Sequence, residues 1–380
     1  MQQVRRPRVL MVGRTRYRLP LNGSLGRKFD ALARRLDLRV LAAAPRGAAA
    51  GDDMFDLQRG TPVPALDGPA FYGALPIRIA RELRRASADA ILAQSPYEAL
   101  AALAGRRLAG SDAAVVVEIH GDWRTWSRLY GSPARAVVAP LADRAALVAI
   151  RRAEAVRTLS PFTTRIVREA GVEPAGTFTT YTELTAFSEP PVAPLPERPA
   201  ALFVGVLERY KNVDAVAEAW RLAAPRVPDA TLRIVGDGRH RDVPAGLVRG
   251  FPGRVTWDRK LETAAVVKAL DESWLLLLPS RSEGTPRVVL ETLCRGRAAV
   301  GARAGGIPDV VHDGQTGLLV DPDRPDEIAD ALVRILSDRE LAQRLGDGGR
   351  QLAAAWTYTA DEYADRVVEL VERAIAAKAA

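Results

Sequence analysis

Short apolar runs alternate with longer amphipathic stretches along almost the whole chain. The runs have the length of buried strands, and the stretches between them repeat their apolar residues at helical spacing. Strands that alternate with helices are typical of parallel α/β domains. We predict strands in the first half at 8–12, 38–43, 90–93, 114–119, 155–159 and 177–181. In the second half we predict strands at 201–204, 230–235, 254–257, 274–278, 298–301 and 317–320.

A proline-rich segment separates the two sets of strands. Residues 187–199 contain five prolines, which block both a helix and a central strand. A chain of 380 residues also fits two domains better than one. We therefore predict one Rossmann-like doubly wound domain at 1–186, a linker at 187–199, a second such domain at 200–356, and a C-terminal helix within 357–380. Two such domains facing each other would leave a cleft at the carboxyl ends of their strands.

Composition narrows the class of protein. No apolar run approaches the ~20 residues that span a bilayer, and the short apolar run near the N-terminus does not indicate a cleaved signal peptide. One cysteine and three histidines exclude an internal disulfide and show no zinc-ligand spacing. A cytoplasmic location is the simplest expectation. Residues 1–110 hold 19 Arg or Lys against 9 Asp or Glu, a net charge of +10, which leaves −2 on the rest.

The segment 282–322 carries the clearest chemistry. Seven residues separate Glu283 from Glu291 across the start of a predicted helix, with Thr285 as its expected N-cap and Pro286 at its first position. Backbone amides at a helix start bind anionic oxygens, and those expected here belong to Thr285, Arg287 and Val288. Carboxylates on either side can accept hydrogen bonds from hydroxyls. Hydroxyl, phosphate, hydroxyl is the pattern of a nucleotide sugar.

This segment resembles the family 4 (group 1) retaining glycosyltransferases, which have the GT-B fold. The two glutamates are followed by Gly296, by a Gly-Gly-x-Pro-Asp run at 305–309 where the family usually ends in Glu, and by Thr-Gly-Leu-Leu-Val at 316–320. The resemblance implies that Glu291 holds the ribose hydroxyls and Glu283 the hydroxyls of the donor sugar. It also implies that the C-terminal helix crosses back to the first domain.

The same resemblance places further donor contacts in the second domain. Arg209 and Lys211, in the loop that begins at Gly205, would stabilise a departing diphosphate, although Val206 stands where the family has an arginine. The alternative is that both cations are solvated residues beside a helix start. Two other donor contacts are expected at the following strand ends, from Gly236 and from the backbone of Leu261.

The first domain would supply the remaining contacts. Gly23 lies in a loop where the backbone could approach a phosphate, with Asn22 or Ser24 as a cap, although an ordinary turn explains it equally well. His120 follows a strongly β-like run, and family members with histidine at this place use it near the donor sugar. Asp122 and Tyr97 are candidate acceptor contacts.

The resemblance implies transfer of a hexose-type sugar from a nucleoside-diphosphate sugar to a glycan or lipid-linked hydroxyl, with the configuration retained by a front-face reaction. We expect no cofactor and no metal, because turn formation accounts for Asp321 and Asp323. The basic first half could attract an anionic partner, such as the inner face of a membrane, although a solvated basic surface explains the charge equally well. Two alternatives remain: a non-hydrolysing nucleotide-sugar epimerase of the same fold, and a non-catalytic anion-binding protein. Nucleic acid is not an expected partner, because the aromatic residues that stack on bases are not interleaved with the basic ones.

Overall fold

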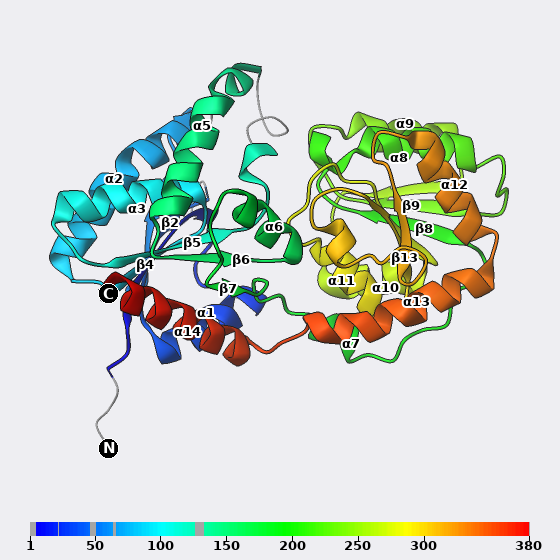
Figure 1. Ribbon diagram of the computed structural model, residues 1–380. Helices are drawn as coiled ribbons and strands as arrows, with labels where there is room; N and C mark the ends of the chain where they lie inside the picture. The colour runs from blue at the N-terminus through cyan, green and yellow to red at the C-terminus, as the bar shows by residue number, and fades with distance from the viewer. Residues whose placement is uncertain (1–4, 22, 46–50, 64–65, 126–132, 380) are drawn as a thin grey trace. The chain divides into compact units, whose positions relative to one another are not determined.

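The computed structural model describes residues 5–21, 23–45, 51–63, 66–125 and 133–379, and the side chains of 133–138 are left out. The chain forms two compact units (Figure 1). The first comprises Met1–Tyr181 together with Tyr358–Ala380, and the second comprises Thr182–Thr357.

The first unit is built on a seven-stranded parallel sheet of order β3-β2-β1-β4-β5-β6-β7. Five of its strands lie where the apolar runs predict them, and a two-residue strand, β7, overlaps the sixth prediction. β3 was not predicted, because its four residues alternate apolar and polar side chains and make no apolar run. The strands are β1 (Arg8–Arg16), β2 (Asp37–Ala43), β3 (Phe55–Gln58), β4 (Ala90–Ala93), β5 (Ala114–Ile119), β6 (Ala155–Thr158) and β7 (Gly176–Thr177).

Helices cover both faces of this sheet (Figure 1). One face packs against α1 (Gly23–Arg35) and α14 (Ala360–Ala379). The other packs against α2 (Asp67–Arg85), α3 (Pro96–Ala109), α5 (Pro133–Arg152) and α6 (Pro161–Glu169). Because α14 comes from the C-terminus and buries Tyr363 and Val367 in the first core, the predicted return of the last helix to the first domain is confirmed.

The second unit repeats the arrangement with a six-stranded parallel sheet of order β10-β9-β8-β11-β12-β13. All six strands lie within a residue or two of the predictions. They are β8 (Ala200–Val204), β9 (Thr231–Val235), β10 (Val255–Asp258), β11 (Leu275–Leu278), β12 (Ala298–Ala302) and β13 (Gly317–Val320). The helices are α7 (Thr185–Ser188), α8 (Val213–Ala223), α9 (Asp242–Gly250), α10 (Thr263–Asp271), α11 (Arg287–Cys294), α12 (Pro325–Leu336) and α13 (Arg339–Ala353), with short 3-10 turns η2 (Arg209–Lys211), η3 (Ile307–Asp309) and η4 (Ala354–Trp356).

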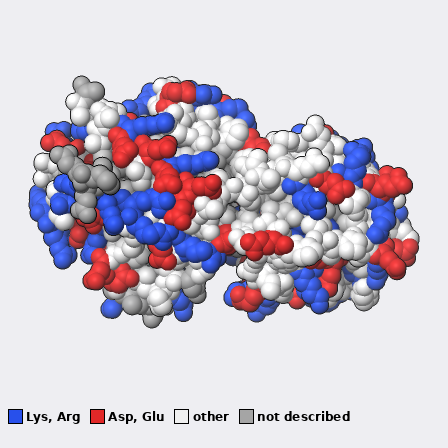
Figure 2. All heavy atoms as spheres, turned by 90° about the horizontal axis from the view of Figure 1, so that it is seen from below, with Lys and Arg blue, Asp and Glu red and all other residues white. Residues whose placement is uncertain are grey.

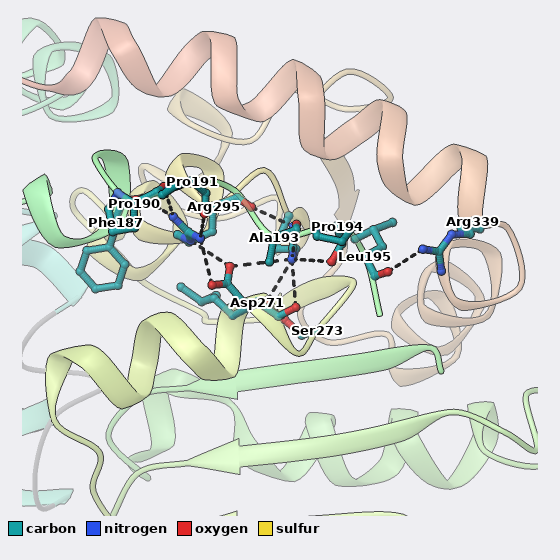
Figure 3. A network of polar contacts seen from close by, with 12 residues as sticks. Phe187, Pro190, Pro191, Ala193, Pro194, Leu195, Asp271, Ser273, Arg295 and Arg339 are labelled. Carbon is teal, nitrogen blue, oxygen red and sulfur yellow. Dashed lines mark hydrogen bonds and ion pairs between the residues drawn. The ribbon is translucent and has the colours of Figure 1, made fainter. Parts of the chain in front are cut away.

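The proline-rich segment belongs to the second unit, which begins at Thr182. Its prolines have no N–H to donate, but its carbonyl oxygens still need donors. Three arginines supply them (Figure 3). Arg295 donates to the carbonyls of residues 187, 190 and 191, Arg297 to those of 193 and 194, and Arg339 to those of 195 and 196. The segment predicted as a linker is thus fastened to the second unit.

Charge is mixed on the first unit despite its basic excess. On the face shown in Figure 2, acidic side chains lie among the Lys and Arg residues. Between α1 and α14, for example, Arg34 and Arg35 pair with Asp361, and Arg35 also pairs with Asp365. Among the described residues, none of the helices has the length and apolarity that a membrane crossing requires.

Candidate functional site

Two neighbouring strands bring Lys211 and Glu283 together. Lys211 ends η2, which follows β8, and Glu283 lies in the loop between β11 and α11. Because β8 and β11 pair in the sheet, residues 72 positions apart meet, with Lys211 Nζ 2.6 Å from Glu283 Oε1. Their side chains are 12% and 13% exposed. The result is a largely buried ion pair at the carboxyl end of the sheet, where ligands of such folds bind.

Glycines let the backbone close around this pair. Gly305 has φ +58°, and a Cβ placed there would lie 2.3 Å from the carbonyl oxygen of Glu283. That carbonyl accepts a hydrogen bond of 2.9 Å from the Gly306 amide. At the end of β9, Gly236 has φ +147°, and a Cβ placed there would lie 1.9 Å from the carbonyl oxygen of Gly205. The glycine positions are therefore set by backbone contacts that any side chain would break.

Glu291 lies one turn into α11 and is almost fully buried. Its Oε1 accepts a 2.7 Å hydrogen bond from Arg287 Nε, four residues earlier. Burial raises the pKa of Glu291 above its ordinary value, and Arg287 opposes that shift. A buried carboxylate with one oxygen paired to an exposed arginine is suited to accept hydrogen bonds from vicinal hydroxyls.

The start of α11 differs from the prediction. The helix begins at Arg287 with Pro286 as its N-cap, and Thr285 makes no capping bond. Thr285 is not the cap because Pro286, with ψ 92°, is the residue that leaves the helical conformation. The Thr285 hydroxyl is buried and has no hydrogen-bond partner among the described residues. A buried hydroxyl without a partner is costly, so this atom is a candidate ligand contact beside the amides of Arg287 and Val288.

Arg209 and Leu261 are the other side chains of the second unit that were proposed for the donor. Arg209, the first residue of η2, is exposed. Leu261 is partly buried against the core below α10 and α11, while Lys260 pairs with Glu262 in solvent. Trp257 donates from Nε1 to the Gly236 carbonyl at 2.8 Å, so its role is structural. Contact of Leu261 with a base stays a prediction.

In the first unit, His120 follows β5 directly. Its Nε2 lies 3.2 Å from Glu118 Oε2, and its side chain is 42% exposed. Asp122 instead holds its own turn: it accepts from the Arg124 amide at 2.9 Å and from the Arg124 guanidinium. Tyr97 is half-buried against the core, and burial with nearby carboxylates raises its pKa to about 12. Acceptor contacts by Asp122 and Tyr97 stay predictions.

Gly23, predicted to lie in a loop, is instead the first residue of α1, with φ +53°. Ser24 therefore lies inside the helix and is not its cap. Of the two proposed caps, Asn22 lies outside the described residues. A phosphate contact by Gly23 stays a prediction.

Comparison with known proteins relates both halves of the chain to glycosyltransferases. Residues 188–352 match the family described as "Glycosyl transferases group 1", and residues 28–179 match "Glycosyltransferase Family 4". The two matches together cover most of the chain and fall one in each compact unit. The chain belongs to the group 1 glycosyltransferases.

Similar curated members of this glycosyltransferase family differ in the sugar that their names specify. Alpha-D-kanosaminyltransferase of Streptomyces kanamyceticus is 34% identical over 163 residues, which are 42% of this chain and 42% of that protein. Sulfoquinovosyl transferase SQD2 of Arabidopsis thaliana is 30% identical over 159 residues, 41% of this chain and 30% of that protein. The matches span less than half the length of either relative.

Solved structures show the same fold over nearly the whole glycosyltransferase chain. Sucrose-phosphate synthase from Thermosynechococcus elongatus superposes with a TM-score of 0.77 and 18% identity, covering 98% of this chain and 100% of that one. HepE of Anabaena, in a complex with UDP, gives a TM-score of 0.67 and 17% identity over 96% and 99% of the two chains. The predicted fold class of two Rossmann-like domains is confirmed.

Sequence reasoning missed the charged cluster behind His120. Glu118 and Arg157 lie side by side on β5 and β6, and Lys28 of α1 is buried near them. A glutamate inside an otherwise apolar strand could have indicated this cluster, because a buried carboxylate needs a charged or hydrogen-bonding partner. Its partner could not be read locally, because Arg157 is 39 residues away.

Asp321 and Asp323 both have partners within the second unit. Asp321 Oδ1 accepts from the Asp323 amide at 2.9 Å, and Asp323 pairs with Arg281 at 2.9 Å. Within the described part of the chain, no group of three or more His, Cys, Asp or Glu side chains could hold a metal ion. Cys294 is buried on α11, and its pKa is raised to about 11 by burial and by Glu291, which is consistent with an unreactive thiol.

Proposed function

We propose that this glycosyltransferase moves a hexose-type sugar from a nucleoside-diphosphate sugar to a hydroxyl acceptor, with retention of configuration and without a metal. The observation that carries the proposal is the Lys211–Glu283 ion pair. It joins a cation suited to a diphosphate and a carboxylate suited to sugar hydroxyls. The buried carboxylate of Glu291 lies farther along the same segment, on α11.

The chemistry assigns each group a role. Negative charge grows on the diphosphate as the bond from the sugar to the diphosphate oxygen breaks, and fixed cations stabilise that charge. Lys211 would bind the diphosphate with Arg209 beside it. Glu283 and Glu291 would accept hydrogen bonds from the donor sugar and the ribose. The acceptor hydroxyl would attack on the face that the diphosphate leaves, and a diphosphate oxygen would take its proton.

Thermal unfolding with UDP, GDP, ADP and CMP tests the donor site. A ligand at ~100 times its dissociation constant stabilises the folded state by about 2.7 kcal/mol. We expect one nucleotide to raise the melting temperature of the wild type and of Glu340→Ala, an exposed acidic control in the same unit. The same nucleotide should not change the melting temperature of Glu291→Ala. The absence of a shift with all four nucleotides would count against the donor site.

Product analysis separates transfer from epimerisation. With the sugar donor of the nucleotide that binds, a transferase releases the nucleoside diphosphate, and NMR of the glycoside shows whether the anomeric configuration is retained. An epimerase of the same fold would instead interconvert nucleotide sugars. Appearance of an epimeric nucleotide sugar without glycoside would replace the proposed function.

We further propose that the acceptor is presented at an anionic membrane surface. The basis is the excess of Arg and Lys in residues 1–110, which would attract acidic headgroups. Sedimentation with vesicles tests this: binding to vesicles containing phosphatidylglycerol, lost at high salt, is expected. Equal retention on neutral vesicles would remove the membrane part of the proposal and leave the transfer reaction intact.

A further inference from the structure

A buried charged cluster lies behind His120 in the first unit. Along β5, Ala114 and Val116 point into the core under α1 and α14, while Val115, Val117 and Ile119 point into the opposite core. Glu118 therefore shares the face of Val116. Its register partner on β6 is Arg157, and both side chains are buried.

Arg157 is held rigidly in this position. Its Nε and Nη2 donate to the Phe178 carbonyl at 3.2 and 3.1 Å, and Nη2 also donates to the Thr179 carbonyl at 2.9 Å. The guanidinium stacks 4.0 Å from the ring centre of Phe178 and lies 5.3 Å from that of Tyr363 on α14. The remaining nitrogen, Nη1, donates to Glu118 Oε1 and contacts the Tyr363 hydroxyl at 3.4 Å.

Glu118 is thereby divided between two partners. Oε1 is committed to Arg157, and Oε2 faces His120 Nε2 at 3.2 Å. Burial alone would raise the pKa of Glu118, but Arg157, His120 and Lys28 outweigh it and hold the pKa below its ordinary value. The carboxylate is ionised at neutral pH and can only accept, so the proton of this hydrogen bond lies on Nε2.

We propose that Glu118 is a positioning residue for His120: it fixes the Nε2–H tautomer and the orientation of the ring, and leaves Nδ1 to meet the substrate. The inference rests on the proposed function and on the expectation, implied by the family resemblance, that a histidine at this place acts near the donor sugar. The ring is 42% exposed, so Nδ1 can be reached by a hydroxyl that donates to it. Arg157 and its aromatic neighbours hold Glu118 in place, and Glu118 in turn orients the ring of His120. Carboxylates orient histidine rings in this way in other proteins.

Nitrogen-15 NMR of the histidine rings tests the tautomer without any substrate. The chain has three histidines, and His120→Asn identifies the signal. At about pH 8, where an ordinary histidine is neutral, the wild type should show Nε2–H. In Glu118→Gln, Arg157 still requires an acceptor, so the amide oxygen faces Arg157 and the NH2 faces His120. The ring should then switch to Nδ1–H.

Glu154→Gln is the matched control, because Glu154 is another largely buried carboxylate of the first unit, paired with Arg106 at 2.8 Å. It should leave the His120 spectrum unchanged. An Nδ1–H tautomer in the wild type would overturn the proposal even if Glu118→Gln failed to fold. The same tautomer in wild type and Glu118→Gln would also overturn it.

Kinetics test whether positioning matters to the reaction. Glu118→Gln should lower kcat/KM for the nucleotide sugar by about 10- to 100-fold, the usual cost of losing a group that orients a histidine. It should add nothing in a His120→Asn background, because residues acting as a unit are not additive. Glu154→Gln should stay within about twofold. Full activity of Glu118→Gln, or additive losses, would refute a positioning role. If the wild type consumed no nucleotide sugar, the proposed function would fail, while the NMR result would still decide the tautomer.

Discussion

Replacing Arg295 with methionine should strongly destabilise the second unit. Arg295 donates to three carbonyl oxygens of the proline-rich segment, at 3.2, 2.8 and 2.8 Å, and pairs with both oxygens of Asp271 at 2.9 Å (Figure 3). Each buried acceptor left without a donor costs about 1–3 kcal/mol, and breaking a buried ion pair costs about 3–5 kcal/mol. Some carbonyls will regain water as the segment loosens, so we expect a total loss of about 3–5 kcal/mol.

Denaturant unfolding followed by tryptophan fluorescence measures this loss, since four of the six tryptophans lie within residues 182–357. Arg303→Met is the control, because Arg303 also contacts a carbonyl and a carboxylate but is half exposed; it should cost at most about 1 kcal/mol. A loss below about 1 kcal/mol for Arg295→Met would refute the reasoning.

Three further predictions concern the donor site. Gly236→Ala should cost about 3 kcal/mol or more by denaturant unfolding, because its Cβ would lie 1.9 Å from the Gly205 carbonyl oxygen; a cost below about 1 kcal/mol would contradict this. The raised pKa of Glu291 means that its contribution to stability is present at low pH and lost as pH rises through the folded-state pKa. Glu291→Gln should therefore match the wild type in melting temperature at about pH 4 and exceed it at about pH 8, while losing the nucleotide shift; equal melting at both pH values would argue against this. Lys211→Met should lower kcat about 10²- to 10³-fold in steady-state transfer assays, and a loss under about tenfold would exclude a role on the diphosphate.

The parallel sheets could be predicted because strands buried on both faces are continuous apolar runs. β4, β5 and β13 lie where the pattern predicts them, because nearly all of their side chains are apolar and buried. β3 was not predicted because it lies at the edge of its sheet and alternates apolar with polar residues. The Glu283 and Glu291 spacing was equally readable, because both residues lie within one short segment.

Local sequence was a poor guide to the cap of α11 and to contacts between distant segments. Thr285 has the residue type of an N-cap, but the cap depends on backbone angles, and the angles of Pro286 decided otherwise. The five prolines indicated where regular structure stops. Which unit the segment packs against was decided by arginines about a hundred residues later in the chain.

By itself, the sequence determined the class of fold, the positions of nearly all strands and the segment that carries Glu283 and Glu291, the glutamates of the proposed donor site. These follow from side-chain periodicity and from spacing within single elements. Tertiary structure alone decided that Lys211 meets Glu283 and that Arg157 holds Glu118 behind His120. The physical reason is that strand order in a doubly wound sheet pairs residues distant in the chain, and no local pattern records the partner of a buried charge.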